Sequence, residues 1–291
     1  MSRLLVTGAA GQLGHDLLRL EPSAIGIDRA ELDLTDAPAV RAFLAAEVPA
    51  VVIHGAAYTA VDAAESHEDV AYAVNATASA NLATACAEVG ARLVAVSTDY
   101  VFAGDRVGGP PYEPSDDPDP RSAYGRTKLA GELAVRALLP DASQVVRTAG
   151  VWGAGGANFV KTIAGLEASR ETLDVVDDQR GSPTWSRDLA AGLLELAARP
   201  DVPAGTYHLT GAGETTWCGF ARAIFAELGA DPDRVRPATT DAVPRPAARP
   251  AYSVLSSRAW VEAGLTPLQN WRAALAEAFA DPTVAAALRG R

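Results

Sequence analysis

The residues best suited to acid–base chemistry lie in one short segment, 122–132, where a tyrosine and a lysine are four residues apart. The composition of the segment favours a helix, and side chains at i and i+4 lie one above the other on a helix face. A phenol has an ordinary pKa of about 10, and a neighbouring cation lowers it. Tyr124 is therefore predicted to exchange a proton near neutral pH with the help of Lys128. Such a pair alone also suits a solvated helix, so its context must decide.

A glycine-rich turn near the N-terminus predicts a dinucleotide site. Residues 3–7 read as a strand, and the leucines of 13–18 have the spacing of a helix. The turn between them contains Gly8, Gly11 and Gly14, which let a pyrophosphate approach the backbone at the positive end of that helix. The spacing differs from the commoner Gly-x-Gly-x-x-Gly, and a tight connection without a ligand is the alternative.

Two further strands bring functional groups to the same edge. The strand 24–27 ends at Asp28, where an acid can accept hydrogen bonds from the adenosine ribose of NAD. Arg29 suits the 2′-phosphate of NADP instead, so the residues leave NADH and NADPH both open. The apolar strand 50–54 ends in small residues that leave room for a cofactor, and its His54 is interpreted as a core residue rather than a catalyst.

A third strand, 92–98, ends in hydroxyl groups followed by a carboxylate, Asp99. Side chains alternate along a strand, so Ser97 should point away from the cleft if Thr98 points into it. Reduction of a ketone by hydride needs a polarised carbonyl and a proton for the developing alkoxide. If the substrate is a ketone, Tyr124 and one of the two hydroxyls, Thr98 or Ser97, are expected to hydrogen-bond the keto oxygen, with Tyr124 delivering the proton.

The length of 291 residues fits a two-lobed α/β protein. The strands and helices predict a doubly wound parallel sheet of the Rossmann type, with the strand 144–151 as its last regular piece. We assign residues 1–151, with about 185–200, to a dinucleotide-binding domain. Residues 152–184 and 201–291 are assigned to a smaller C-terminal substrate lobe.

The charge balance argues against two classes of partner. Lys and Arg total 25 and Asp and Glu total 36, which gives a net charge of −11 and no basic run. Nucleic acid and anionic membranes are therefore not expected partners. The two cysteines, Cys86 and Cys218, are too few for a disulfide framework, and no signal peptide is recognised, so a cytoplasmic location is expected.

In this order, the features resemble the extended short-chain dehydrogenase/reductase family, and within it the dTDP-4-dehydrorhamnose reductases. The strongest matches are at 56–65, 97–102, 124–132 and 177–184. The resemblance implies an NAD(P)H-dependent oxidoreductase that reduces the C4 ketone of dTDP-4-dehydro-L-rhamnose to dTDP-L-rhamnose. It also implies a dTDP-sugar as the partner and allows a homodimer.

The resemblance also implies roles for particular residues. The catalytic group is Thr98, Tyr124 and Lys128, with Thr98 at the family's Ser/Thr position. The cofactor group is Gly8, Gly11, Gln12, Leu13, Asp28, Arg29, Asp33, Leu34, Ala57, Tyr58, Thr59, Tyr124 and Lys128. The substrate group is Thr98, Asp99, Trp152, Asn158, Lys161 and Arg180. No metal site is predicted, although Asp16 stands where some relatives bind a divalent cation.

One departure from the family bears on the sugar. The chain has Gly150 where these reductases commonly have a tryptophan implicated in sugar contact, and Trp152 is a hypothetical replacement. Two other interpretations stay open. One is a reductase or epimerase of another nucleotide-linked 4-keto-6-deoxyhexose, and the other is a non-catalytic regulatory subunit of the same fold, against which the retained Thr98, Tyr124 and Lys128 argue.

Overall fold

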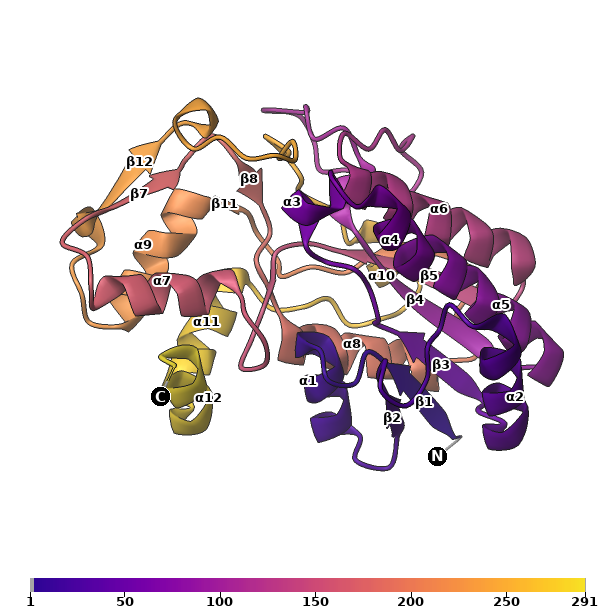
Figure 1. Cartoon of the computed structure of the whole chain (residues 1–291). Coiled ribbons are helices and arrows are strands. Elements are labelled where there is room, and N and C mark those ends of the chain that lie inside the picture. The colour runs from indigo at the N-terminus through magenta and orange to yellow at the C-terminus, as the bar shows by residue number, and fades with distance from the viewer. Residues whose placement is uncertain (1–2, 291) are drawn as a thin grey trace.

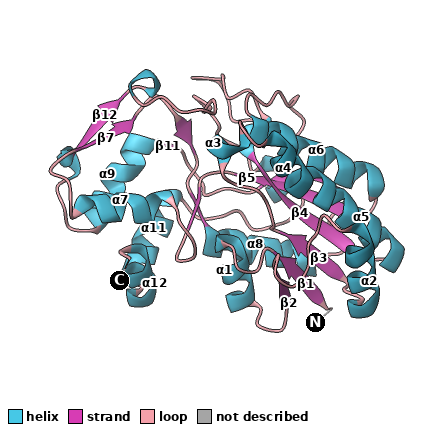
Figure 2. Cartoon of the chain, viewed as in Figure 1, coloured by secondary structure: helices cyan, strands magenta, loops and turns pink. Residues whose placement is uncertain are grey.

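The computed structural model describes residues 3–290, and its centre is a sheet of six parallel strands (Figures 1 and 2). The strand order is β10-β5-β4-β3-β1-β2. The strands are β1 (Leu4–Thr7), β2 (Ile25–Ile27), β3 (Val51–His54), β4 (Arg92–Thr98), β5 (Ser143–Thr148) and β10 (Gly205–His208). The strand order turns at β1, which pairs with β2 on one side and β3 on the other, and ligands bind at such a switch point in open α/β sheets.

Helices cover both faces of the sheet. One face packs against α1 (Gln12–Leu20) and α8 (Ser186–Ala198), and the other against α2 (Ala37–Glu47), α5 (Ala78–Val89) and α6 (Ala123–Leu138). Neighbouring residues of each strand enter opposite cores: Leu5 packs with the α2 side and Val6 with the α8 side. Double burial explains why the strands read as continuous apolar runs. The predicted Rossmann-type fold is confirmed.

The remaining chain builds a second half on the left of Figure 1. Its elements are α7 (Phe159–Glu167), β7 (Leu173–Val176), α9 (Trp217–Glu227), β12 (Val235–Ala238), α11 (Trp271–Ala280) and α12 (Pro282–Leu288). The parallel pair β7–β12 packs on α9 around buried Phe220. Where the chain crosses between the halves, β6 (Val151–Trp152) pairs with β9 (Thr184–Trp185), and their indoles stack with centroids 5.8 Å apart.

Shorter elements connect these parts. They are α3 (Val61–Ala64), α4 (Glu68–Tyr72), the π-helical turn η1 (Ala73–Thr77), η2 (Asp99–Val101), β8 (Arg180–Gly181), β11 (Thr215–Thr216), η3 (Pro232–Arg234), η4 (Thr240–Ala242) and α10 (Arg258–Glu262). The helix expected over about 68–89 is therefore continuous but contains one wide turn. Within residues 3–290, no helix has both the length and the apolar character that a membrane crossing requires.

Two features differ from the sequence-based prediction. The strand predicted over 144–151 ends at Thr148, because Gly150 adopts φ +54° and turns the chain out of the sheet. β10 lies in the region assigned to the substrate lobe, yet it pairs with β5 at the edge of the main sheet. Trp260 of α10 also packs in the core formed by α8. The sheet therefore recruits late segments of the chain, and a sharp lobe boundary at residue 201 does not describe it.

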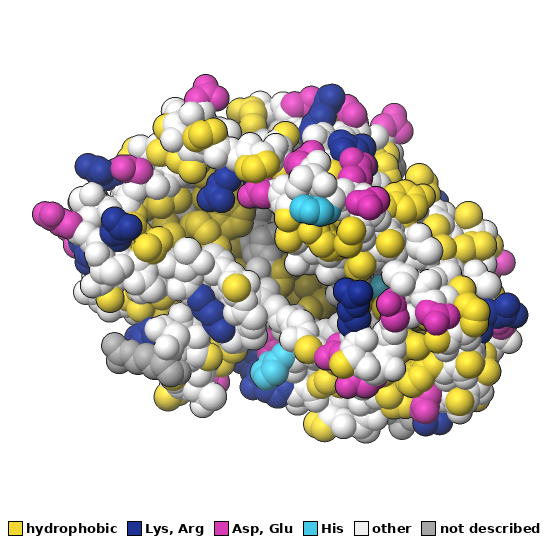
Figure 3. Space-filling model, in the orientation of Figure 1, with side chains coloured by type: hydrophobic (Ala, Val, Ile, Leu, Met, Phe, Trp, Pro, Cys, Tyr) yellow, Lys and Arg dark blue, Asp and Glu magenta, His cyan; other side chains and the backbone are white. Residues whose placement is uncertain are grey.

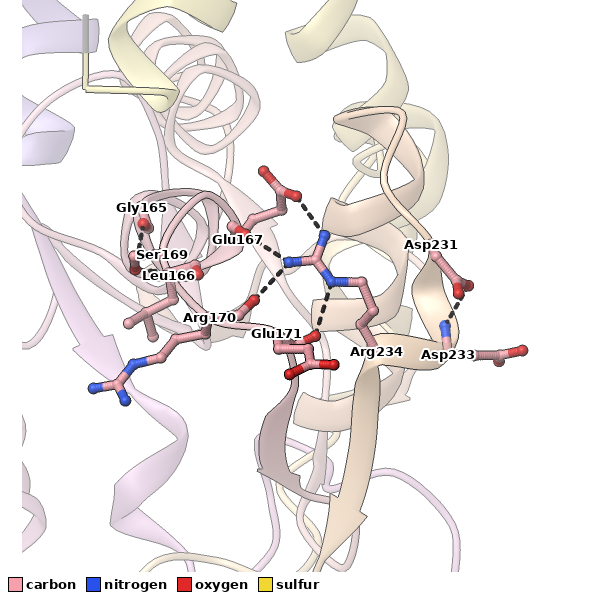
Figure 4. Close-up of polar contacts among 9 residues, drawn as sticks. All are labelled: Gly165, Leu166, Glu167, Ser169, Arg170, Glu171, Asp231, Asp233 and Arg234. Carbon is pink, nitrogen blue, oxygen red and sulfur yellow. Dashed lines mark hydrogen bonds and ion pairs between the residues drawn. The ribbon is translucent and has the colours of Figure 1, made fainter.

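Arg234, the residue before β12, joins the start of that strand to the segment after α7 within the second half of the molecule, as Figure 4 shows. Its guanidinium donates hydrogen bonds to the carbonyl of Glu167 (2.7 Å), the last residue of α7, and to the carbonyls of Arg170 (2.6 Å) and Glu171 (3.0 Å) in the segment that follows the helix. It also pairs with the Glu167 carboxylate and lies over the ring of Phe225. A cation at this end satisfies carbonyls that the helix leaves free.

We expect Arg234→Ala to lower the free energy of unfolding by about 1 to 2 kcal/mol, because three carbonyls lose a charged donor. Urea denaturation measures the change. Arg236 is the matched control: it pairs with Asp174 at an exposed position, and Arg236→Ala should cost under about 1 kcal/mol. An equal loss in the free energy of unfolding for the two variants would show that the hydrogen bonds of Arg234 to the three carbonyls do not stabilise the protein.

Candidate active site

A cavity of about 960 Å³ lies above the carboxyl ends of the strands, and Figure 3 shows the molecule hollowed between its two halves. Its walls come from segments far apart in the sequence. They include the glycine turn, the loop after β3, the end of β4, α6, and the segments around Arg180 and Thr215. The volume is at the upper end of the usual range for ligand sites. One continuous space thus joins the predicted cofactor end to the predicted substrate end.

Tyr124 and Lys128 line this cavity from α6, the helix predicted around them. The Ser122 side chain caps the helix by accepting from the Gly125 amide at 3.1 Å, which places Tyr124 in the first turn. The Lys128 ammonium donates to the Val96 carbonyl at 2.8 Å. Both side chains are held against the end of β4.

The protonation states differ from the sequence-based expectation. Burial raises the pKa of Tyr124 to about 12, the Asp99 charge adds to the rise, and the Thr98 hydroxyl beside the phenol opposes it. Burial lowers the pKa of Lys128 to about 8, and the nearby Glu132 carboxylate opposes that shift. The prediction that Lys128 lowers the pKa of Tyr124 is therefore wrong for the protein without bound ligands. Tyr124 retains its proton at neutral pH, which is the state that a proton donor needs.

Thr98 ends β4 beside Tyr124, and its hydroxyl donates to the Asp99 carboxylate at 3.0 Å. Ser97 donates instead to Glu132, so the two hydroxyls have different partners, although both residues line the cavity. Burial raises the pKa of Asp99 to about 6, against hydrogen bonds from Ser253 and Thr98. Two hydroxyls, Thr98 and Tyr124, thus share one wall with a carboxyl group that is largely ionised at neutral pH.

The cofactor end has the close backbone approach that a dinucleotide requires. A Cβ added at Gly8 would lie 2.7 Å from the Ala56 amide nitrogen, and one added at Gly14 would lie 2.2 Å from the Gly8 carbonyl oxygen. α1 begins at the end of this turn, and the amides of its first residues have no partner within the helix. Only glycine allows the turn to pack this tightly against the backbone, and a tight glycine turn at a helix N-terminus fits a pyrophosphate.

A second, smaller cavity of about 100 Å³ continues from Gly8 along β2. Besides Gly8, four residues predicted for the cofactor line it: Asp28, Arg29, Asp33 and Leu34. The Asp28 carboxylate accepts from the Ala30 amide at 2.8 Å, whereas Arg29 also lines the large cavity. The structure thus gathers the predicted adenosine residues in one place. The remaining predicted cofactor residues, Gly11, Gln12, Leu13, Ala57, Tyr58 and Thr59, line the large cavity.

The predicted substrate residues divide into two groups. Thr98, Asp99 and Arg180 line the cavity. Trp152 does not: it is 1% exposed and packs between Trp185 and Phe220, so the hypothesis that it replaces the family tryptophan is not supported. A side chain at Gly150 would meet the backbone of Pro183 at 3.3 Å.

Asn158 and Lys161 also lie outside the cavity lining, in structural positions. The Asn158 side chain caps α7 and donates to Gln12 at 2.8 Å, which ties the second half to the glycine turn. The Lys161 ammonium donates to the Ala154 carbonyl at 2.6 Å. Helix capping by asparagine is a recognisable sequence signal, and here it explains the residue better than ligand binding does.

Several cavity residues were not predicted from the sequence. They are Gln179, Ser182, Pro183, Thr215, Thr216, Trp217, Pro250 and Ser253. Thr216 caps α9 by accepting from the Gly219 amide at 3.0 Å, so a Thr-Thr-Trp helix start was a readable local signal. Nothing local marks Ser253, which reaches the site through the fold of the C-terminal segment.

Two buried histidines predict acid sensitivity. Burial lowers the pKa of His54 to about 3 and that of His208 to about 3. An unfolded ring has a pKa of about 6.5, so below that value the unfolded chain binds protons that the folded chain does not. Stability should therefore fall as pH decreases from 6.5 towards 3, by about 1.4 kcal/mol per pH unit for each ring.

Urea unfolding at pH 7 and pH 5 tests this acid sensitivity. His208→Gln should reduce the difference between the two pH values. The control variants His15→Gln and His67→Gln replace exposed rings and should leave the difference in stability between pH 7 and pH 5 unchanged. An unchanged difference in His208→Gln would show that this ring is not kept neutral by the fold.

Known proteins match this chain over nearly its whole length. The family described as the RmlD substrate binding domain matches residues 2–284. The chain belongs to this family. It is 51% identical to the dTDP-4-dehydrorhamnose reductase of Streptomyces griseus, over 95% of the chain and 93% of the relative. It is 47% identical to the dTDP-4-keto-6-deoxy-D-glucose reductase of Streptomyces niveus, over 95% and 96%.

A solved structure of the RmlD family extends the comparison to three dimensions. The dTDP-4-dehydrorhamnose reductase of Bacillus anthracis in complex with NADP superimposes with a TM-score of 0.90 and 38% identity, covering 95% of this chain and 98% of that one. This chain is thus an RmlD-family protein of the oxidoreductase type along nearly its whole length. The similarity confirms the resemblance drawn from the motifs.

Proposed function

We propose that this protein reduces the C4 ketone of dTDP-4-dehydro-L-rhamnose to dTDP-L-rhamnose with NADPH or NADH. The observation that carries the proposal is the single cavity that joins the glycine turn to Thr98, Tyr124 and Lys128. Its second-half end, with Arg180, offers a cation for the substrate diphosphate. The reductases of the RmlD family support the same reaction.

A nicotinamide coenzyme held at the glycine turn and the loop after β3 would supply the hydride for the C4 carbon. Thr98 and Tyr124 hydrogen-bond the keto oxygen and polarise it, and Tyr124 transfers its phenolic proton to that oxygen as negative charge develops there. Lys128 stabilises the resulting phenolate electrostatically. The ketone thus gains one hydride at carbon and one proton at oxygen and becomes the sugar alcohol, and solvent later returns a proton to Tyr124.

The pKa of Lys128 gives the proposal a pH signature. Because burial lowers it to about 8, the ammonium is charged below that pH and loses its charge above it. We expect kcat/KM for NADPH to be level between about pH 6.5 and 7.5 and to fall above pH 8, since kcat/KM reports groups of the free enzyme. In Lys128→Arg the fall should disappear, because guanidinium stays charged. A fall that persists in that variant would assign it to another group.

The direct test follows the absorbance of NADPH and NADH at 340 nm with dTDP-4-dehydro-L-rhamnose. Stoichiometric oxidation of coenzyme, with dTDP-L-rhamnose as the product, is the expected result. An epimerase would consume no coenzyme, and a non-catalytic regulatory subunit would give no response. Either outcome overturns the proposal.

A second candidate is the reduction of another dTDP-linked 4-keto-6-deoxyhexose. It is favoured by the similar identity to the relative named for dTDP-4-keto-6-deoxy-D-glucose, and by Gly150, which brings no aromatic ring to the sugar end. Trp217 lines the cavity from a different element. Competing the two ketosugars at equal concentration and comparing kcat/KM distinguishes the candidates.

The setting of the enzyme also belongs to the proposal. A cytoplasmic location is supported by two buried free thiols, and a net charge of −11 argues against nucleic acid as a partner. A homodimer remains a proposal, which light scattering tests. The two-lobed organisation is supported by separate hydrophobic cores in the two halves.

A further inference from the structure

His54 is the centre of a buried hydrogen-bond chain beneath the cofactor end of the cavity. The ring is 2% exposed, with Thr7 Oγ1 at 2.7 Å from Nδ1 and Ser79 Oγ at 3.1 Å from Nε2. Ser79 in turn donates to the Asn75 carbonyl at 2.7 Å. None of these four residues lines the cavity. Thr7, His54, Asn75 and Ser79 lie on β1, β3, η1 and α5 in that order, so these hydrogen bonds link four elements that are separate in sequence.

The direction of the donors fixes the state of the ring. Ser79 uses its proton on the Asn75 carbonyl, so it must accept from Nε2–H of His54. Nδ1 is then the acceptor for the Thr7 hydroxyl, whose oxygen accepts from the Ala56 amide at 3.4 Å. Every group in the chain is satisfied with a neutral imidazole. A ring with both nitrogens engaged in this way supports structure and does not shuttle protons.

Asn75 holds the other side of the same loop. Its amide oxygen accepts from the Tyr58 amide at 2.8 Å, and its amide nitrogen donates to the Tyr58 carbonyl at 3.2 Å. The same nitrogen donates to Thr127 at 3.0 Å, one residue before Lys128. The π-helical turn at 73–77 places Asn75 for these contacts, and such turns occur frequently at functional sites.

We propose that His54 is a positioning residue for the nicotinamide coenzyme, acting through the loop 55–59. This inference rests on the proposed function, because it assumes that the coenzyme lies between that loop and the glycine turn. Ala56 to Thr59 line the cavity, and the backbones of Gly8 and Ala56 pack so closely that a Cβ added at Gly8 would lie 2.7 Å from the Ala56 nitrogen. The hydrogen bonds through Thr7 and Asn75 therefore set the width of the coenzyme cleft from both ends of the loop.

The test compares His54→Leu with His208→Leu. Both rings are buried and neutral, but His208 lies on β10, the edge strand, and its Nδ1 bonds to the Tyr112 carbonyl at 3.0 Å. The readout is the dissociation constant of NADPH, measured by fluorescence titration without sugar nucleotide, together with the melting temperature. Both variants should melt earlier. His54→Leu alone should weaken NADPH binding by about tenfold, as loss of a supporting residue does at other sites.

A rescue series keeps the test informative if His54→Leu folds poorly. His54→Gln retains a donor towards Ser79, and it should recover part of the NADPH affinity. The KM for the coenzyme should rise in both variants, while the KM for the sugar nucleotide stays near the wild-type value. Unchanged NADPH affinity in both His54 variants, or equal loss in His208→Leu, would overturn the inference.

The two proposals fail in different ways. A wild-type protein that binds NADPH but does not reduce the ketosugar refutes the proposed function and leaves the role of His54 intact. A wild-type protein that reduces the ketosugar, with His54 variants of normal NADPH affinity, refutes the role of His54 alone. Absence of NADPH and NADH binding to the wild-type protein refutes both.

Discussion

Tyr124→Phe should reduce kcat by about 10²- to 10⁴-fold, the range over which a positioned general acid accelerates reactions. The phenol is buried beside Thr98, and its pKa is raised to about 12, so it carries its proton at the pH of the reaction. Phenylalanine keeps the ring that packs edge-on against Tyr100 at 5.6 Å and removes only the hydroxyl. The loss should therefore appear in turnover and not in folding.

Steady-state kinetics and NADPH titration separate the two effects. The NADPH dissociation constant and the melting temperature of Tyr124→Phe should stay close to the wild-type values. Tyr207→Phe is the matched control, because Tyr207 lies on the edge strand β10, donates its hydroxyl to the Pro203 carbonyl just before that strand, and lines no part of the cavity. Near-normal turnover in Tyr124→Phe would remove the assignment of the proton donor.

Arg147→Met should lower the free energy of unfolding by about 3 to 5 kcal/mol, because it leaves a buried carboxylate without its partner. Arg147 and Glu132 are buried, and they form a two-pronged pair with Nη2 to Oε2 at 2.7 Å and Nε to Oε1 at 3.0 Å. Ser97 completes the shell of Glu132. In the variant, Glu132 keeps only that hydroxyl.

A double-variant cycle tests whether the cost comes from the unpaired charge. Arg147→Met combined with Glu132→Leu should recover most of the lost stability in urea denaturation, because apolar groups replace both charges. Arg126, which pairs with Glu68 at an exposed position, provides the control: Arg126→Met should cost under about 1 kcal/mol. If the double variant is as unstable as the single one, the loss reflects packing of the guanidinium over Phe102, not the unpaired charge.

The sequence was most informative where the signal is local. The glycine turn, the apolar strands and the helix around Tyr124 each depend on a few neighbouring residues, and the structure shows each of them. The cavity lining follows, because parallel strands bring their carboxyl ends to one edge. The order of motifs along the chain thus predicted the residues that meet at the ends of the parallel strands, but not those of the second half.

Long-range packing was the part that the sequence did not reveal. Trp152 and Trp217 are equally aromatic in sequence, but only the fold makes one a core residue and the other a wall of the cavity. The Tyr124 expectation failed for a related reason. The spacing predicts that the phenol and the ammonium share a helix face, yet burial is the main cause of both pKa shifts, and it raises the pKa of Tyr124 and lowers that of Lys128.

The late position of β10 has a consequence for synthesis. A growing polypeptide emerges from the ribosome N-terminus first, and the sheet still lacks its edge strand after β5 has been made. Nearly sixty residues, including α7 and α8, are translated between Thr148 and Gly205 before that edge is covered. A nascent chain halted in this interval exposes the flank of β5, so chaperone capture should be strongest there.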